Sequence, residues 1–444
     1  MITTSEAAHR LSVSRSRVLE LIKRGQLRAD KMSGVWLVDE DSVDERLRTV
    51  SKKGGRPLRG SGKDDVRFTF MSRTHAVASV VYNRSRKEFT FIDSSLDAAR
   101  VPIGLGDDPR QIPLFEFNRW WRGRGIPQTR NGVDQVLRAA GVEVPEELLQ
   151  RNLGLSLSDQ YWVCPEGSGL RWEDVNFFNN DFEEVDLRTE PYAEGGAHAH
   201  PDNTSDGNLA KYWVVRDGVR MLRKGGLHND QEPYNEVVAT ALFRRLLAEG
   251  EYVAYTLEGK GSAAWSLCAN FLSDEEEYVP AMYVERLKEQ SPDANDFDHY
   301  IECCEQLGAD GARDAIERMI TCDDVLANHD RHHRNFGIVR NVETLECRPA
   351  PIFDSGSSLW CDVDTESLSR GEFKFTSKQF EASPARQLLL VDDLSWFDIS
   401  RMEGFVDEAI EILSANDALK DRLPYIRRGL EQRVARMIDI VEWS

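Results

Sequence analysis

The residues with the clearest capacity for chemistry lie late in the chain, in the segment NHDRHHRNFGIV at positions 328–339. Its core is Asp330, followed after four intervening residues by Asn335, and an Asp-Ser-Gly triplet begins at Asp354. In phosphoryl transfer, one aspartate accepts the proton of the attacking hydroxyl, while an asparagine and a second aspartate hold Mg²⁺. A short loop can bring the side chains of Asp330 and Asn335 to one phosphate. The hairpin expected after this loop would bring Asp354 back to the same place. These residues predict a phosphotransfer site.

A structural interpretation of the same segment is the alternative. A cluster of Asp, His and Arg can form a hydrogen-bonded turn or a solvated patch of ion pairs. The loop, the hairpin and the second aspartate together favour phosphotransfer. A zinc site is a further alternative, because three histidines lie close together at His329, His332 and His333. It is disfavoured because no fourth ligand follows at the spacing of a zinc finger. We expect Arg331 and His332 to orient the loop.

A phosphotransfer site also needs groups that hold the nucleotide. Upstream, an expected hairpin with an Asp-Gly turn ends in Lys224, and the helix that follows carries Glu236 in its first turns. A strand lysine paired with a helix glutamate is the kinase device for clamping the α- and β-phosphates of ATP. Lys224 and Glu236 are the predicted pair, with Lys211 and Glu232 as close competitors.

Two further segments complete the expected ATP site. Gly207 and Asn208 lie in the turn before the hairpin, where a kinase places its glycine loop over the phosphates. Strands expected at 252–257 and 264–272 finish a small lobe and lead into a hinge. The backbone groups expected to face adenine belong to Asn270, Phe271 and Leu272.

The remaining periodicity outlines the body of the protein. Residues 66–93 are enriched in β-branched and aromatic residues typical of paired strands, and residues 114–151 contain short helices. Trp120 and Trp121 are expected in a core, with a ligand platform as the alternative. From residue 278 onward the pattern is mainly helical. The predicted fold class is α+β, with a two-lobed, protein-kinase-like body and an α-rich large lobe.

The length and composition limit the number of domains and indicate the cellular compartment. The 444 residues allow two to four domains, and 41% hydrophobic with 30% charged residues is the balance of a globular protein. No apolar run approaches the roughly 18 residues that span a bilayer. The first ten residues lack the pattern of a signal peptide, so we expect a cytoplasmic protein without a membrane partner. The seven cysteines form no Cys-x-x-Cys pair, which disfavours a zinc ribbon or disulfide framework.

The charge is divided unevenly along the chain. The net charge is −20, yet residues 1–63 carry 14 Lys/Arg against 8 Asp/Glu. Counterion release on nucleic acid requires a basic surface. DNA binding is therefore expected of a small basic module at the start of the chain and not of the acidic body.

This basic module has the pattern of a helix-turn-helix. One helix is expected at 4–11 and a second at 15–24, with apolar residues on one face and a break between them. The segment 27–38 is expected to form a small hairpin or wing. Contacts with base edges or phosphates are expected from Arg15, Ser16 and Arg17 at the start of the second helix and from Lys31 in the wing.

A protein-docking module is the alternative interpretation of these two helices. Basic residues on the exposed face favour DNA, and a homodimer is expected because one such helix covers half a site. Residues 51–65, rich in Gly, Lys and Arg, predict a flexible linker. The expected domains are 1–50 for the DNA module, 66–155 for an N-terminal subdomain, 156–275 for the small lobe and 276–444 for the large lobe.

Two resemblances to known families follow from these motifs. TTSEAAHRLSVSRSRVLELIKRGQLRA with GVWLVDEDSV, within residues 3–47, resembles the excisionase-type winged helix-turn-helix. HDRHHRNFGIV and PIFDSGSSLW, preceded by MLRKGG and EPYNEVVATAL, resemble the HipA-like serine/threonine kinases, a family that includes bacterial toxin kinases. The second resemblance covers roughly residues 66–444, and its catalytic core is similar to that of phosphatidylinositol kinases.

The HipA-like resemblance implies ATP and Mg²⁺ as cofactors. Asp330 would be the catalytic base, Asn335 and Asp354 the magnesium ligands, and Lys224 the phosphate ligand. Some members autophosphorylate in the glycine loop, which points to Thr204 and Ser205. This chain departs from toxin kinases whose DNA-binding antitoxin is a separate protein, because its own module is fused at the N-terminus.

Three functions are compatible with these residues. The first is a protein kinase, of toxin–antitoxin type or otherwise, whose module binds DNA such as its own promoter, so that activity and expression are linked. The second is a small-molecule or lipid phosphotransferase, since the Asp-x₄-Asn loop serves those enzymes too. The third is a DNA-binding regulator whose kinase body only senses nucleotide. The protein substrate is open in the first.

Overall fold

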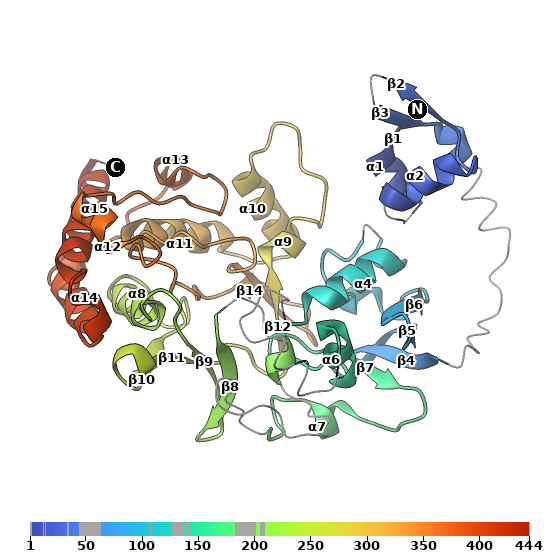
Figure 1. Ribbon diagram of the computed structural model, residues 1–444, viewed down its shortest axis with the longest axis horizontal. Helices are drawn as coiled ribbons and strands as arrows, with labels where there is room; N and C mark the ends of the chain where they lie inside the picture. Colours follow the sequence, from blue (N-terminus) through green and yellow to red (C-terminus); the bar gives the residue numbers. More distant parts are fainter. Residues whose placement is uncertain are drawn as a thin grey trace.

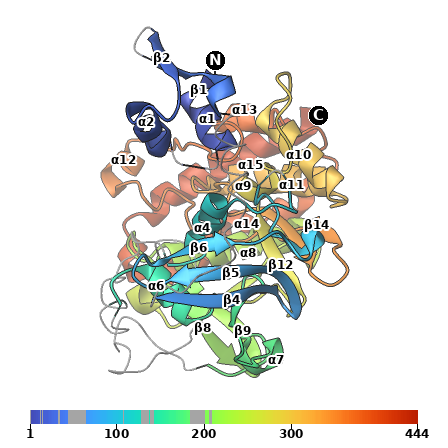
Figure 2. The ribbon, with the colours of Figure 1, turned by 90° about the vertical axis from the view of Figure 1, so that its right-hand side faces the viewer.

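The computed structural model describes residues 2–11, 13, 15–32, 35–43, 64–106, 108–126, 137, 142–182, 201–204 and 209–443. After residue 63 the described chain contains two four-stranded sheets and one three-stranded sheet. Figure 1 shows the helices α8, α11, α14 and α15 gathered at the side of the body where the chain ends. Figure 2 shows the sheet β4–β6 lying beneath helix α4. The fold is α+β, as predicted.

The N-terminal module contains two helices and a small sheet of order β1-β3-β2. Ala7, Val18 and Leu21 lie in its core, which explains the helical spacing of apolar residues in the sequence. The expected helices and hairpin are confirmed. The elements are β1 (Ile2–Thr3), α1 (Thr4–Arg10), α2 (Arg15–Lys23), β2 (Ala29–Met32) and β3 (Val35–Val38).

The next part of the chain forms an antiparallel sheet of order β6-β5-β4-β7. Trp120 and Trp121 are buried on it, with ring centroids 5.7 Å from Phe70 and 5.2 Å from Phe89 respectively. These tryptophans are core residues, as expected. The elements are β4 (Asp65–Ser72), β5 (His75–Asn83), β6 (Glu88–Ile92), η1 (Ala98–Arg100), α4 (Leu114–Gly123), α6 (Pro145–Arg151), β7 (Tyr161–Pro165) and α7 (Trp172–Val175).

A second antiparallel sheet, of order β10-β11-β9-β8, packs against helix α8. Its β8–β9 hairpin turns at Asp217 and Gly218, whose φ angles of 50° and 79° suit the Asp-Gly turns that join twisted strands. The elements are η2 (Pro201–Thr204), β8 (Lys211–Arg216), β9 (Val219–Lys224), α8 (Glu232–Leu246), β10 (Tyr255–Glu258), η3 (Gly261–Ala263) and β11 (Trp265–Ala269).

The C-terminal part is mainly helical and includes a third sheet, of order β12-β13-β14. The helices share one large apolar core with α8. The elements are β12 (Glu276–Pro280), α9 (Ala281–Val284), α10 (Asp296–Gln306), α11 (Ala312–Leu326), β13 (Gly337–Asn341), β14 (Cys347–Pro349), α12 (Thr365–Ser369), α13 (Pro384–Leu388), η4 (Ile399–Met402), α14 (Phe405–Ser414), η5 (Asp417–Leu419) and α15 (Leu423–Trp443).

The return strand of the β13–β14 hairpin is shorter than the sequence suggests. The sequence predicts a strand that reaches Phe353, but β14 ends at Pro349. Ala350 N still donates to Gly337 O at 3.0 Å, where β13 begins, but Pro349 and Pro351 carry no amide hydrogen, and the ladder does not continue to Phe353. Ile352 instead pairs with the small-lobe segment, donating to Glu251 O at 2.8 Å and accepting from Val253 N at 2.9 Å.

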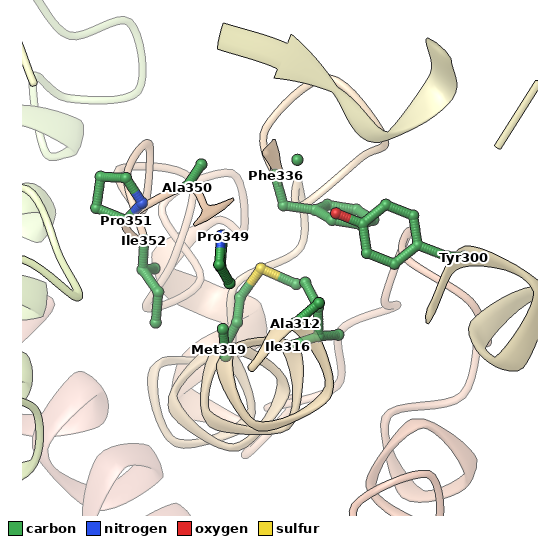
Figure 3. Close-up of a pocket in the computed structure, with 11 residues that line it drawn as sticks. Tyr300, Ala312, Ile316, Met319, Phe336, Pro349, Ala350, Pro351 and Ile352 are labelled. Atoms are coloured by element: carbon green, nitrogen blue, oxygen red, sulfur yellow. The ribbon is translucent and has the colours of Figure 1, made fainter. Parts of the chain in front are cut away.

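A small cavity of about 10 Å³ lies under this hairpin. Figure 3 shows Met319 and Ile316 of α11 on one side, Pro349 to Ile352 on another, and Phe336 beside Tyr300. Its lining is largely apolar and its volume is that of one water at most. The cavity is therefore a packing void and offers no room for a nucleotide.

Among the described residues, none of the helices combines the length and apolar character needed to cross a membrane.

Candidate active site

Three of the predicted residues meet at the end of β9. Lys224 Nζ donates to Glu236 Oε1 on α8 and to Asp354 Oδ1 beyond the β13–β14 hairpin. The lysine and glutamate are buried, with 4% and 1% of their surface exposed. The ring of Tyr255 lies beneath the ammonium, 5.3 Å from centroid to Nζ. One ammonium group thus joins a strand, a helix and a loop that lies 130 positions further along the chain.

The charges of this trio are set by burial and by each other. Burial alone lowers the pKa of Lys224, but Asp354 and Glu236 raise it above its ordinary value. Burial raises the pKa of Glu236 against the pull of Lys224. Burial also opposes ionisation of Asp354, yet Lys224 and Lys211 hold the pKa of this carboxyl below its ordinary value. Of the two carboxyls, Asp354 is therefore the one whose charged form is favoured more strongly.

The loop that carries Asp354 is pinned to helix α8. Ser355 N donates to Glu236 Oε2 at 2.9 Å, and Asn235 Nδ2 donates to the carbonyls of Gly356 and Ser358 at 2.8 Å. A Cβ on Gly356 would lie 3.2 Å from Glu232 O, so glycine permits this approach. Asp354 itself has φ of 58°, a left-handed conformation that aspartate tolerates better than most residues.

The loop between α11 and β13 brings Asp330 and Asn335 together through its own backbone. Asn335 Nδ2 donates to Asp330 O at 3.1 Å, and Asn335 N donates to His332 O at 2.7 Å. The Asp330 carboxylate is partly exposed and accepts from Lys378 Nζ at 2.6 Å. The asparagine is nearly buried, while the aspartate is accessible to a substrate group.

Arg331 joins this loop to the Asp354 segment. It is completely buried and forms a two-pronged ion pair with Asp323, with Nε to Oδ2 at 2.9 Å and NH2 to Oδ1 at 3.0 Å. It also donates to Asn335 O at 3.1 Å, to Phe353 O, and to Ser355 Oγ at 2.9 Å. The guanidinium therefore sets the relative positions of the two halves of the site, and it orients the loop as expected.

The sequence interpretation missed three residues that serve this network. Asp323 anchors Arg331, Gln379 Nε2 donates to Asp323 Oδ2 at 2.9 Å, and Lys378 contacts Asp330. Asp323 lies in the last turn of helix α11, where the helix dipole disfavours an acid, so its position was a usable signal. Lys378 and Gln379 lie in a segment without periodicity, and no sequence signal marks them.

His333 clamps the same loop to two other segments. Its Nδ1 lies 2.7 Å from Glu285 Oε1, and its Nε2 lies 2.6 Å from Gln379 O. A carboxylate and a carbonyl are both acceptors, so the doubly protonated ring matches both. Burial lowers the pKa of His333, but Glu285 and the Gln379 carbonyl outweigh burial and raise the pKa above its ordinary value.

This clamp predicts a pH-dependent stability. Because the folded pKa of His333 is above the unfolded value of 6.5, its contribution is fully present below that pH and is lost as pH rises through the folded pKa. Below pH 6 we expect His333→Asn to lower the free energy of unfolding by about 1.5–3 kcal/mol. The difference between parent and variant, measured in urea, should shrink as pH increases. A difference that is constant between pH 5.5 and 9 would contradict the charged clamp.

The competing candidates occupy other positions. Lys211 lies opposite Lys224 in the β8–β9 register, and Glu232 accepts from Leu227 N at 3.1 Å and from His228 N at 3.0 Å. Glu232 therefore holds the loop before α8, whereas Glu236 meets the lysine. Geometry separates the two glutamates, which sequence spacing could not.

The expected adenine-facing residues lie beyond β11. Asn270 Nδ2 donates to Leu157 O at 3.0 Å, Phe271 packs 5.4 Å from Phe353, and Leu272 is buried in an apolar cluster with Trp162 and Trp172. The role of their backbone groups stays a prediction.

Several predicted residues fall at the edge of what the structure describes. Gly207, Asn208 and Ser205 lie outside the described residues, as does most of the 51–65 linker. Thr204 ends η2, and its side chain is outside the described part. The glycine loop and its phosphorylation sites therefore stay predictions.

In the N-terminal module, the predicted DNA contacts are exposed. Arg15, Ser16 and Arg17 open helix α2, and Lys31 lies on β2. Arg15 Nε donates to Thr4 Oγ1 at 3.1 Å, and Arg17 pairs with Glu20. The module thus presents three consecutive polar residues at a helix start.

Comparison with known proteins agrees with this architecture. Residues 1–51 match the family described as a helix-turn-helix domain. No curated protein matches the chain in sequence. The HipA, HipB and operator DNA complex of Shewanella oneidensis MR-1 contains a chain with 11% identity and a TM-score of 0.54, covering 84% of this chain and 98% of that one. The proinflammatory kinase CtkA of Helicobacter pylori has 16% identity and a TM-score of 0.39, covering 53% of this chain and 94% of that one.

The likeness to the HipA complex chain and the helix-turn-helix match establish the fold. The body has the fold of the toxin kinase HipA, and a helix-turn-helix domain precedes it. The predicted family resemblances are confirmed at that level.

Proposed function

We propose that this chain is an ATP- and Mg²⁺-dependent serine/threonine protein kinase of HipA type whose N-terminal module binds DNA. The observation that carries the proposal is the meeting of Lys224 with Glu236 and Asp354, joined through Arg331 to the Asp330–Asn335 loop. The proposed domain boundaries at 50, 65 and 275 are those expected from the sequence, and the boundary expected at 155 is moved beyond β7, because β7 pairs with β4 of the N-terminal subdomain. The proposed location is the cytoplasm, which contains both ATP and DNA.

The donor chemistry of the site fits Mg²⁺. Magnesium prefers hard oxygen ligands, and Asp354 offers an ionised carboxylate. The Asn335 amide nitrogen is used inside the loop, so its oxygen is the atom suited to a cation. Bound Mg²⁺ would neutralise charge on the β- and γ-phosphates. Asn335 and Asp354 are the proposed ligands.

The chain's own residues account for the other parts of phosphoryl transfer. Lys224, held by Glu236, would bind ATP phosphates, with Gly207 and Asn208 covering them and Asn270 to Leu272 facing adenine. Asp330 would accept the proton of a substrate hydroxyl. Its carboxylate is paired with Lys378, so a hydroxyl must displace or share this lysine contact. Catalysis by these residues would then consist of positioning ATP and the substrate, stabilising the charge on the phosphates, and accepting one proton from the hydroxyl.

Phosphate transfer from labelled ATP tests the substrate class. Purified chain with ATP and Mg²⁺ should label itself, at Thr204 or Ser205, or should label a protein in a lysate. Label found only on a sugar, antibiotic or lipid would replace this proposal by the small-molecule alternative. Nucleotide binding without any transfer would favour the regulator whose body only senses nucleotide.

DNA binding is proposed for residues 1–50, with a homodimer covering two half-sites. The support is the helix-turn-helix match and the exposed start of α2. The solved HipA and HipB complex contains operator DNA. Because the module and the kinase are one chain here, occupancy of a promoter would track the amount of kinase.

The DNA contacts predict a specific loss of affinity. Arg15→Ala and Arg17→Ala should each weaken binding by about 1–3 kcal/mol if they reach base edges. The measurement is fluorescence anisotropy with a labelled duplex from the region upstream of the chain's own gene. Arg110→Ala, an exposed arginine of the body with 81% of its side chain accessible, is the matched control and should bind as the parent does. Equal affinity of all variants would indicate a docking module.

A further inference from the structure

The protein has a second cluster of ligating side chains, adjacent to the catalytic loop and centred on Cys361. Ligand atoms of His228, Glu232 and Cys361 lie within 4.8 Å of one another, and those of His329, Cys361 and Asp362 do the same. Cys361 belongs to both triads. Sequence spacing concealed this cluster because its members come from three segments about 100 and 30 residues apart.

The cluster is mostly enclosed. Cys361 and Glu232 are 3% and 2% exposed, while the side chains of His329 and His228 are 20% and 42% exposed. A cation reaching the two histidines from solvent would meet the buried sulfur and carboxylate behind them. This arrangement provides both a path from solvent and an interior binding position.

The carboxylates are already oriented. Glu232 accepts from the backbone amides of Leu227 and His228, and its Oε1 lies 2.6 Å from His228 Nδ1. Asp362 Oδ2 lies 3.6 Å from His329 Nε2. Histidines that bind metals usually have a carboxylate or carbonyl beside the ring, which fixes ring orientation and raises basicity. Asp362 has this place beside His329, whereas Glu232, beside His228, is close enough to bind the same cation as that histidine.

We propose that Cys361, His228 and Glu232, whose ligand atoms lie within 4.8 Å of one another, bind one Zn²⁺. Sulfur and imidazole donors select zinc over Mg²⁺, and three protein ligands with one water complete its tetrahedral coordination. A thiolate, a carboxylate and a neutral imidazole balance the charge of the cation, so the buried site is neutral. On binding, the Cys361 S–H bond breaks, an S–Zn bond forms and the proton leaves to the buffer.

The proposed zinc links parts that flank the kinase site. His228 and Glu232 lie between Lys224 and Glu236 in the chain, His329 precedes Asp330, and Cys361 follows the Asp354 loop. His329 N also donates to Ser357 O at 3.1 Å. Bound zinc would therefore hold the start of α8 against the segment that carries Cys361, and the bond from His329 N to Ser357 O ties the chain just before Cys361 to the catalytic loop.

Metal binding by the full chain tests the proposal. Chain stripped with a chelator should take up one equivalent of Zn²⁺ in competition with a chromogenic chelator, release a proton, and unfold at a higher temperature. With Co²⁺ instead, it should show a thiolate-to-metal charge-transfer band. Excess Mg²⁺ should displace neither ion, because the proposed magnesium ligands are other residues.

Variants at the cluster make the result decisive. Cys361→Ser should lose stoichiometric zinc and the charge-transfer band, and His228→Gln, on a half-exposed loop, should lose zinc while keeping its fold by circular dichroism. Cys347→Ser is the matched control, since Cys347 lies on β14 outside the cluster, and it should bind zinc as the parent does. Absence of binding by the parent, or zinc that survives Cys361→Ser or His228→Gln, would overturn the proposal.

Discussion

Replacing Asp330 with asparagine is expected to lower the rate of phosphate transfer from ATP by about 10²–10⁴-fold, the range typical for removal of a general base. The amide cannot accept the hydroxyl proton, and the change removes a charge without changing the volume. The Asp330 carboxylate pairs with Lys378, and 36% and 48% of the two side chains are exposed. Such a pair contributes about 0–1 kcal/mol, so the variant should remain folded.

Asp354→Asn is the companion variant and should fail in a different way. It removes the proposed magnesium carboxylate and one of the two partners of Lys224. We expect transfer to be lost and the dependence on Mg²⁺ concentration to shift upward in any residual activity. Asp407→Asn, an exposed acid on α14 paired with Arg427, is the matched control and should retain the parental rate. Undiminished labelling by the Asp330→Asn variant would refute the assignment of the base.

Arg331→Met is expected to be the most destabilising single change in the site, by about 3–5 kcal/mol. Arg331 has no exposed surface, and its removal leaves the buried Asp323 carboxylate without its ion-pair partner. It also releases Phe353 O and Ser355 Oγ, so the Asp354 segment loses its tie to the catalytic loop. Arg331→Lys should rescue little, because an ammonium cannot reproduce the two-pronged geometry of a guanidinium.

Urea unfolding followed by tryptophan fluorescence measures this effect. Arg348→Met is the matched control, since its pair with Glu276 at 3.0 Å is half-exposed and should contribute under about 1 kcal/mol. The double variant Arg331→Met with Asp323→Leu should recover part of the loss, because no buried charge then lacks a partner. An Arg331→Met variant as stable as Arg348→Met would show that the network does not hold the site.

Local patterns in the sequence were sufficient for most elements of the fold. The apolar spacing of helices α8, α11 and α15 and the Asp-Gly turn before Lys224 depend on residues within a few positions of each other. The end of β14 at Pro349 is also a local property, since Pro349 and Pro351 are visible in the sequence. The candidate residues Asp330, Asn335 and Asp354 were equally readable, because their spacing is set by one loop and one hairpin.

Contacts between distant segments could not be read in this way. The choice of Glu236 over Glu232, which are one helical turn apart, depends on where α8 lies against β9 and the Asp354 loop. Lys378 meets Asp330 across 48 positions, and no periodicity connects them. Proximity of this kind follows from how the whole chain packs.

The sequence by itself determined the fold class, the helix-turn-helix and the residues suited to phosphoryl transfer, because residue type and short-range spacing are properties of the chain alone. Only the tertiary structure decided the Lys224–Glu236–Asp354 trio, the burial of Arg331 on Asp323 and the His/Cys/Glu cluster around Cys361. The physical reason is that a side chain's partners and its pKa depend on the charges and solvent that packing brings near it, and packing joins residues without regard to their distance in sequence.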